Sequence, residues 1–184
     1  MLIASSLTLW LVVAQPALAA EVTLRDRVLD LVSGYEDAPT SDELHKLGDG
    51  VDLALIDIAK DASVGRSRRS GAIWALGLFP NDTTHAFVLG VAQDPAADSL
   101  LRRSATWALC NGWGDAALAE VKSALESDDA QLRNQAVRAV AKVGTPAALA
   151  TLQQRLPLES SAMVRDTLNA SIQTISAPAQ GEIK

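Results

Sequence analysis

The sequence predicts an all-α protein, a right-handed α-solenoid of about four helical hairpins with an N-terminal helical cap. The stretch LRRSATWALCNGWG at 101–114 largely repeats RRSGAIWALGLFPN at 68–81, with Trp107 aligned on Trp74. A third copy, RNQAVRAVAKVG, lies at 133–144, and a weaker fourth follows it. Self-similarity at a period just above 30 residues is typical of one helical unit stacked on itself. The composition agrees, because 48% of residues are apolar but only 4% are aromatic, which suits closely packed helices.

Residues 1–19 have the layout of a secretory signal peptide. No charged side chain occurs in the first twenty residues, and the apolar run LTLWLVVA is followed by Gln15, Pro16 and an Ala-x-Ala sequence ending at Ala19. The alternative is an uncleaved membrane anchor, but serine, threonine, glutamine and proline interrupt the roughly 20 apolar residues that a span needs. We therefore expect cleavage, a periplasmic or secreted protein, and no membrane span afterwards.

Residues 20–50 predict a cap of two short helices. Apolar residues over 21–36 recur at helical spacing. Thr40 and Glu43 then form the pattern of a capping box, which satisfies free amides at the start of a second helix. A stack needs such a cap because its end repeat would otherwise expose an apolar face to water.

Residues 51–175 predict four units, each with a first helix and a return helix. The expected pairs are 51–60 with 67–78, 85–92 with 99–110, 116–125 with 130–143, and 146–156 with 161–175. Gly48, Gly114 and Gly144 fall at unit ends, where a helix C-terminus favours a residue that tolerates positive φ. Residues 176–184 hold few apolar side chains, so we expect a disordered tail.

The period and the phrase in the return helices resemble the short HEAT-like repeats of bacteria over roughly 48–175. The similarity is greatest to the subtype described in phycobilin lyase subunits, where Arg-Arg-x-Ala-x-Trp-Ala-Leu-Gly recurs. Here the phrase is RRSGAIWALG and RRSATWALC, with Gly71 and Cys110 as departures. The resemblance implies a solenoid. It implies no single function, since such repeats occur in scaffolds, adaptors, lyases and nucleic-acid enzymes.

One row of side chains on the return helices is the candidate binding surface. Trp74, Trp107 and Arg138 share a repeat position that lies off the core stripe, toward the concave side of a solenoid. Such a strip could stack on an aromatic or proline-containing peptide and pair with a carboxylate. Alternatively, the tryptophans only fill the groove between successive return helices. The candidate partner-binding residues are Trp74, Leu78, Arg103, Trp107, Asn111 and Arg138.

A second row consists of arginines at the start of each return helix. Its members are Arg69, Arg102, Arg133 and Arg165. The resemblance implies that they bond acidic residues and carbonyls of neighbouring turns and hold the units in register. Arg68 and Arg103 are additional charges that could face an anionic ligand.

Several classes of site are disfavoured. Cys110 is the single cysteine, so neither an intramolecular disulfide nor a cysteine metal cluster is expected, and its place in a helix predicts burial. His45 and His85 lie in different units without converging ligands. There is no glycine-rich phosphate loop, nucleophile elbow or His-Glu-x-x-His sequence. We expect no catalytic residue, metal or cofactor, and the net charge of −6 disfavours nucleic acid.

These features favour an exported scaffold or adaptor, not an enzyme, that binds a protein or peptide partner on its concave face. The alternative is a bilin-lyase-like enzyme or lyase subunit, which the repeat phrase suggests and a signal peptide contradicts. A HEAT-like DNA glycosylase is a third hypothesis. It needs a carboxylate beside the tryptophans, whereas the positions one turn on are Leu78 and Asn111.

Overall fold

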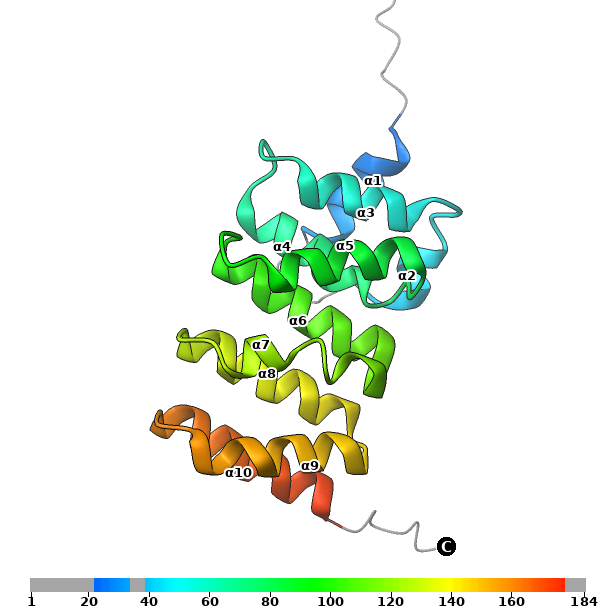
Figure 1. The fold of residues 1–184 in the computed structure, drawn as a ribbon. Coiled ribbons are helices and arrows are strands. Elements are labelled where there is room, and N and C mark those ends of the chain that lie inside the picture. The colour runs from blue at the N-terminus through cyan, green and yellow to red at the C-terminus, as the bar shows by residue number, and fades with distance from the viewer. Residues whose placement is uncertain (1–21, 34–38, 178–184) are drawn as a thin grey trace, which may run out of the picture.

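The computed structural model describes residues 22–33 and 39–177, and every regular element in these ranges is a helix (Figure 1). The predicted α-solenoid is therefore confirmed. The signal peptide predicted at 1–19 lies outside the described residues, as does the tail from residue 178 onward. None of the described helices has the length and apolar character needed to cross a bilayer.

The helices form hairpins that follow one another along the stack (Figure 1). In chain order they are α1 (Leu24–Leu31), α2 (Ser41–His45), α3 (Val51–Lys60), α4 (Arg66–Leu76), α5 (Asp82–Gln93), α6 (Ser99–Trp113), η1 (Gly114–Ala117), α7 (Lys122–Leu125), α8 (Ala130–Val143), α9 (Pro146–Arg155), η2 (Leu156–Leu158) and α10 (Ala162–Ser176). Helix α1 packs on α3, ahead of the hairpins α3–α4, α5–α6, α7–α8 and α9–α10.

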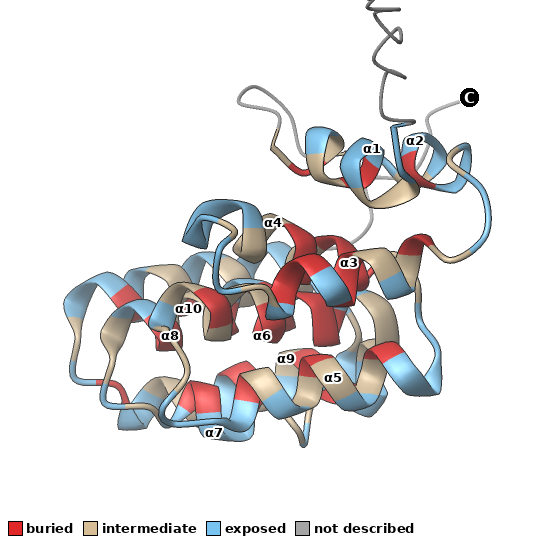
Figure 2. Ribbon diagram, turned by 90° about the horizontal axis from the view of Figure 1, so that it is seen from above, coloured by how far each residue is buried: buried red, intermediate tan, exposed pale blue. Residues whose placement is uncertain are grey.

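The two helices of each hairpin belong to different layers. Seen from above, α5, α7 and α9 lie on one side and α6, α8 and α10 on the other, with buried residues between them (Figure 2). The return helices α4, α6, α8 and α10 each contact the next extensively, whereas the first helices touch one another only slightly. A stack whose helices are closer in one layer curves toward that layer. We therefore call α4, α6, α8 and α10 the inner layer.

Small residues allow the inner helices to approach closely. A Cβ added to Gly77 would lie 2.8 Å from the carbonyl oxygen of Ala108, and one on Gly112 would lie 3.1 Å from that of Gly77. The hydroxyls of Ser70 and Ser104 are 2.7 Å apart across the same α4–α6 contact. We call this α4–α6 contact the seam. Side chains larger than glycine or serine cannot fit in the seam without moving one helix away from the other.

Gly71, one of the two departures from the repeat phrase, also marks a close contact. A Cβ at this position would lie 2.8 Å from the carbonyl oxygen of Val32, directly after α1. The end of α1 thus rests against α4 as well as α3. Glycine at position 71 makes room for the end of α1, because the Cβ of an alanine there would collide with the Val32 carbonyl.

The predicted helix ends are largely those of the structure. The amide of Thr40 donates to the Glu43 carboxylate at 2.8 Å, and the Thr40 hydroxyl accepts from the Glu43 amide, so the capping box of α2 is confirmed. Asp129 caps α8 through the amide of Gln131. The predicted positive φ angles are confirmed as 101° at Gly48, 55° at Gly114 and 72° at Gly144.

The prediction of one regular helix over 116–125 is wrong. This segment contains the 3-10 helix η1, a series of turns and the four-residue α7. The repeat spacing explains the difference, because Arg133 follows Arg102 by 31 residues whereas Arg102 follows Arg69 by 33. A 3-10 helix rises about 2.0 Å per residue against about 1.5 Å for an α-helix, so tighter winding lets fewer residues span the layer.

Two helices are longer than predicted. Helix α5 begins at Asp82 instead of residue 85, because the Asn81 side chain accepts a hydrogen bond from the amide of Thr84 at 3.0 Å and caps an earlier turn. Helix α6 continues past Cys110 to Trp113 and ends where Gly114 takes up its positive φ. Both extensions lengthen the second hairpin.

The arginine row holds the two layers together, as predicted. Each arginine in the first turn of a return helix donates to the backbone near the end of the first helix of its own unit. The contacts are Arg69 to the carbonyl of Ala59 at 2.8 Å, Arg102 to that of Ala92 at 3.4 Å, Arg133 to that of Ser127 at 2.7 Å and Arg165 to that of Glu159 at 3.3 Å.

Glu159 adds a buried ion cluster between the third and fourth units. Its side chain is fully buried and accepts two hydrogen bonds from Arg133, at 2.9 and 2.8 Å, and one from Arg155 at 2.9 Å. The amide of Ser161 donates to the same carboxylate at 2.8 Å. The hydrogen bonds from Arg133 are the main reason why the pKa of Glu159 falls from 4.5 to about 2. The charged carboxylate is therefore the form that the fold stabilises.

Replacing Glu159 by glutamine should leave two arginines without their shared charge and lower the free energy of unfolding by about 3–5 kcal/mol. The matched control is Glu126→Gln, since Glu126 is exposed and pairs with Lys122 at 3.8 Å, a contact worth about 0.5 kcal/mol at most. Urea unfolding followed by circular dichroism at pH 7 measures both. Equal losses in the two variants would contradict a structural role for the buried cluster.

The contribution of Glu159 should also depend on pH. Its folded-state pKa lies below its ordinary value, so the stabilisation is present in full above about pH 5 and is lost as the pH falls through 4.5 toward 2. The difference in unfolding free energy between the wild type and Glu159→Gln should therefore shrink over this range. A difference as large at pH 3 as at pH 7 would rule this linkage out.

Two glycine-to-alanine substitutions should have opposite effects. Gly77→Ala places a methyl group against the Ala108 backbone and should cost about 1–3 kcal/mol of stability. Gly90 lies within α5 with nothing inside 4 Å of an added Cβ, so Gly90→Ala should raise stability by up to about 1 kcal/mol. Thermal unfolding of both variants measures the two effects. An unchanged stability of Gly77→Ala would show that α4 and α6 are not tightly packed at this position.

Candidate functional site

The predicted row of side chains runs along the inner layer. Trp74 stands on α4, Trp107 on α6 and Arg138 on α8, and Ala170 occupies the same repeat position on α10. Both tryptophans are half-buried and pack against the hydrophobic core, while Arg138 is exposed. Each indole thus fills part of a groove and also keeps accessible ring surface. The two interpretations of these tryptophans are compatible in this geometry.

The flanking candidates have structural contacts of their own. Leu78 lies just after α4, half-buried against the core. The Asn111 amide donates to the carbonyl of Gly77 at 3.1 Å and so satisfies an oxygen at the end of α4. Asn111 nevertheless remains at the surface. Its part in binding stays a prediction.

Three buried polar atoms on α6 and α8 have no hydrogen-bond partner among the described residues. They are Nε of Arg103, Nε1 of Trp107 and Oδ1 of Asn134. Arg103 and Trp107 stand one turn apart on α6, and Asn134 occupies the Arg103 position on α8. Buried polar atoms usually have partners, because their desolvation is otherwise uncompensated. These atoms mark a part of the inner layer that is suited to a polar ligand.

The inner layer is also strongly basic. Helices α4, α6 and α8 contain no acidic residue, and α10 contains only Asp166. Apart from the arginine row and Arg66, which pairs with Asp98 at 3.3 Å, the basic side chains of these helices are Arg68, Arg103, Arg138 and Lys142. No acidic side chain among the described residues forms an ion pair with any of these four.

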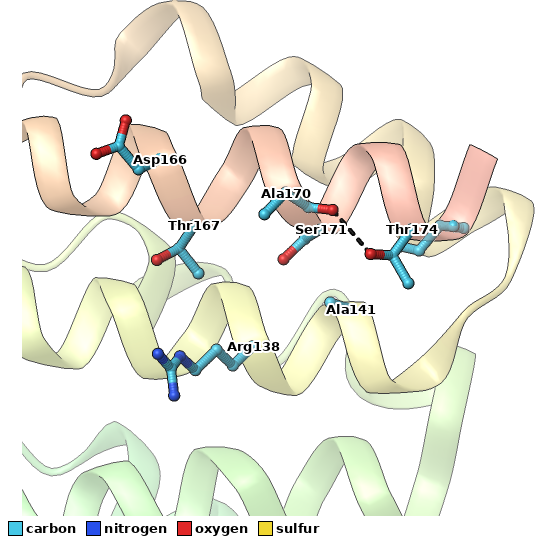
Figure 3. Close-up of a pocket in the computed structure, with 8 residues that line it drawn as sticks. Arg138, Ala141, Asp166, Thr167, Ala170, Ser171 and Thr174 are labelled. Atoms are coloured by element: carbon cyan, nitrogen blue, oxygen red, sulfur yellow. Dashed lines mark hydrogen bonds between the residues drawn. The ribbon is translucent and has the colours of Figure 1, made fainter. Parts of the chain in front are cut away.

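A groove of about 460 Å³ opens between α8 and α10, where the row of tryptophans has ended (Figure 3). Arg138 and Ala141 line it from α8, and Thr167 and Ser171 face them from α10. Ala170, which occupies the row position on α10, is also among its lining residues. Figure 3 shows Arg138 lying along α8 with its guanidinium turned away from Asp166. Arg138 forms no ion pair with any residue that the structure describes, so the groove offers a cation beside hydroxyl groups.

Residues 91–173 match the family model of HEAT repeats. Over this range the chain consists of HEAT-like repeats. No curated protein matches it. The matched range runs from the end of α5 into α10, so it contains Trp107, Arg138 and the groove between α8 and α10. HEAT repeats form helical scaffolds for protein interaction, and the family is generally not catalytic.

The cysteine and the two histidines lie in the described part of the chain, and each has a packing or hydrogen-bonding role there. Burial raises the pKa of the Cys110 thiol to about 12, so it stays protonated, and the predicted burial of this residue is confirmed. The imidazole of His85 is 3.0 Å from the carboxylate of Glu120, while that of His45 stacks on Phe79. Within the described residues, no three histidine, cysteine or acidic side chains converge on one metal position.

The groove between α8 and α10, with Thr167 and Ser171, was not predicted from the sequence. The available signal was Ala170, because a small residue in the tryptophan position predicts a gap. The unpartnered atoms could not be found from the sequence, since their state depends on which neighbours the packing brings within hydrogen-bond distance.

Fluorescence quenching should detect the basic surroundings of Trp107. In a variant whose Trp10, Trp74 and Trp113 are phenylalanine, iodide should quench Trp107 more efficiently than caesium, because Arg103 and Arg138 attract anions. Adding Arg138→Glu should reduce the iodide effect.

The matched control is a variant that retains only Trp113. Its ring lies 4.9 Å from that of His85, which bonds Glu120, so an excess of iodide quenching is not expected. The same ratio of iodide to caesium quenching for Trp107 and Trp113 would contradict a basic inner layer.

Proposed function

We propose that this HEAT-like protein is an exported, non-enzymatic scaffold that binds an extended segment of a partner protein along its inner layer. The observation that carries the proposal is the row of Trp74, Trp107 and Arg138 on three consecutive inner helices. Half-buried indoles are effective anchors, because they are already held by the core and lose little freedom when a partner packs on them.

The geometry of the row fits an extended peptide. Neighbouring helices pack about 10 Å apart, and an extended chain advances about 3.3 Å per residue. Successive positions of the row therefore correspond to partner residues about three apart. Two apolar or proline side chains at this interval would meet Trp74 and Trp107, and a third position would meet Arg138.

Export is supported by the N-terminal sequence. Its first twenty residues are uncharged and end in an Ala-x-Ala sequence at Ala19. Expression with this leader, followed by N-terminal sequencing of the product, tests this part of the proposal. A mature chain that begins at Ala20 is the expected result, and a retained Met1 would contradict it.

Site-specific crosslinking tests the binding surface. A photoreactive amino acid at Thr174, which is exposed on the inner side, should give a discrete adduct with a partner in cells. The same group at Ser123 or Gln154, exposed on α7 and α9, is the control and should not. Adducts formed equally well from the outer positions would contradict binding on the inner layer.

The inner-layer adduct should depend on the tryptophans. Trp107→Ala should reduce its yield about tenfold or more, as expected for an interface anchor. Leu158→Ala is the matched control, since Leu158 is an apolar side chain that is 73% exposed at η2. An adduct that is indifferent to Trp107→Ala would remove the tryptophan row from the proposal.

The bilin-lyase alternative rests on the phrases RRSGAIWALG and RRSATWALC alone. Mixing the purified protein with a bilin separates the two functions. A scaffold leaves the visible absorbance of the bilin unchanged, whereas a lyase or lyase subunit that binds it shifts the spectrum.

A further inference from the structure

We infer that the partner segment is acidic and that its carboxylates bind the cations of the inner layer at α6 and α8. This inference rests on the proposed function and names the chemistry of the partner at the same site. It goes beyond the tryptophan row, because it assigns a charge and a spacing to the segment that the scaffold recognises.

Charge complementarity is the first reason. The chain has a net charge of −6, yet α4, α6 and α8 contain basic residues and no acidic one. The arginines in the first turns of the return helices already donate hydrogen bonds to backbone carbonyls. Arg103, Arg138 and Lys142 form no ion pair among the described residues. Cations that form no ion pair within the described chain favour an anionic partner.

The unpartnered atoms on α6 are the second reason. Nε of Arg103 and Nε1 of Trp107 are both hydrogen-bond donors, and both are buried without an acceptor. The acidic side chain whose charge Arg103 senses, Asp129, accepts from the Ser99 hydroxyl and the Gln131 amide instead. A carboxylate supplies two acceptor oxygens, so one acidic side chain could serve both donors once the side chains of Arg103 and Trp107 turn to open these buried atoms.

Asn134 is consistent with the same ligand. Its unpartnered atom is an acceptor as placed, but a carboxamide can turn over and present its amino group from the same position. The site would then offer donors from both α6 and α8.

The groove between α8 and α10 is the third reason. Arg138 lies beside the hydroxyls of Thr167 and Ser171 (Figure 3). The Thr167 hydroxyl donates to the carbonyl of Met163 at 3.1 Å, so the Ser171 hydroxyl is the one that can donate to a carboxylate next to the cation. Asp166 is the opposing charge at this groove, and its carboxylate points away from Arg138. The groove can therefore accept a second acidic side chain beyond the one at α6.

The occupant is an acidic protein segment and not a nucleic acid. Cations on successive helices require anionic groups about three residues apart in an extended chain. A peptide with apolar residues followed by glutamates at this interval matches the change from tryptophan to arginine along the row. A long nucleic acid would extend beyond the inner layer, where the net negative charge of the protein would repel its phosphates.

Fluorescence anisotropy with the full chain tests the inference. The probe is a fluorescein-labelled peptide with two leucines and then two glutamates, each three residues apart on a serine background, together with its reversed order because the direction of the segment is open. One of the two should bind, and replacing its glutamates by glutamine should weaken binding about tenfold or more. Binding should also weaken as salt is raised.

Substitutions of exposed basic residues locate the surface that contacts the peptide. Arg138→Glu and Lys142→Glu should each weaken the glutamate peptide about tenfold and should leave the glutamine peptide unchanged. The matched control is Arg27→Glu, which reverses an exposed charge on α1 and should have no effect. Circular dichroism of each variant checks that the helices remain folded.

Several outcomes overturn the inference. They are no binding of the glutamate peptide in either order, equal binding of the glutamine peptide, no effect of Arg138→Glu and Lys142→Glu, or tighter binding of a single-stranded DNA of equal length. An inner-layer crosslink whose yield ignores Arg138→Glu would remove the acidic partner but leave the scaffold. Absence of inner-layer crosslinks would remove the scaffold itself.

Discussion

The close contact between successive return helices is the constraint on which the rest of the structure depends. Gly77 and Gly112 meet across the α4–α6 seam, where backbone approaches backbone. Large side chains of these helices must therefore stand beside the seam and not within it. This requirement places Trp74 and Trp107 at the rim of the grooves, half in the core and half in solvent. The tight seam and the accessible indoles are two results of one packing arrangement.

The arginines of the return helices have two roles, and the position along the helix determines which one applies. Arg69 and Arg102 stand in the first turn of their helices and reach back to carbonyls of the preceding helix. Arg103 is one residue further along, and that single step of about 100° around the helix turns it from the hairpin interior to the inner layer. On α8, Arg138 lies more than one turn after Arg133 and is exposed. Local register thus decides whether an arginine stabilises the hairpin or lies on the inner layer.

Much of the fold could be predicted because its signals are local or periodic. Thr40 and Glu43 are three residues apart, and the positive φ of Gly144 follows from its place after a helix. Other features depend on contacts between distant segments. Glu159 has no equivalent in the other units, and its principal partner Arg133 is 26 residues away, so nothing in the repeat pattern indicates their ion pair.

Some features of the candidate site could likewise be predicted from the sequence, and others depend on packing. The position of Trp107 on the inner layer follows from helical periodicity, whereas the missing partner of its indole nitrogen depends on the neighbouring helix. Asn111 was predicted from its place one turn after Trp107, and its hydrogen bond to Gly77 arises only when α4 and α6 are brought together. Sequence periodicity therefore locates the surface, and packing decides which of its atoms remain available.

The ion cluster around Glu159 has a consequence for how the molecule comes apart. In a linear array each hairpin is held only by its neighbours, and the α9–α10 hairpin has one neighbour among the described units. Glu159 joins that hairpin to the third unit through a charge that acid removes. Fraying in acid should therefore begin at this end, with hydrogen exchange rising first in α10. The hairpins that present the two indoles would stay assembled while the last one opens.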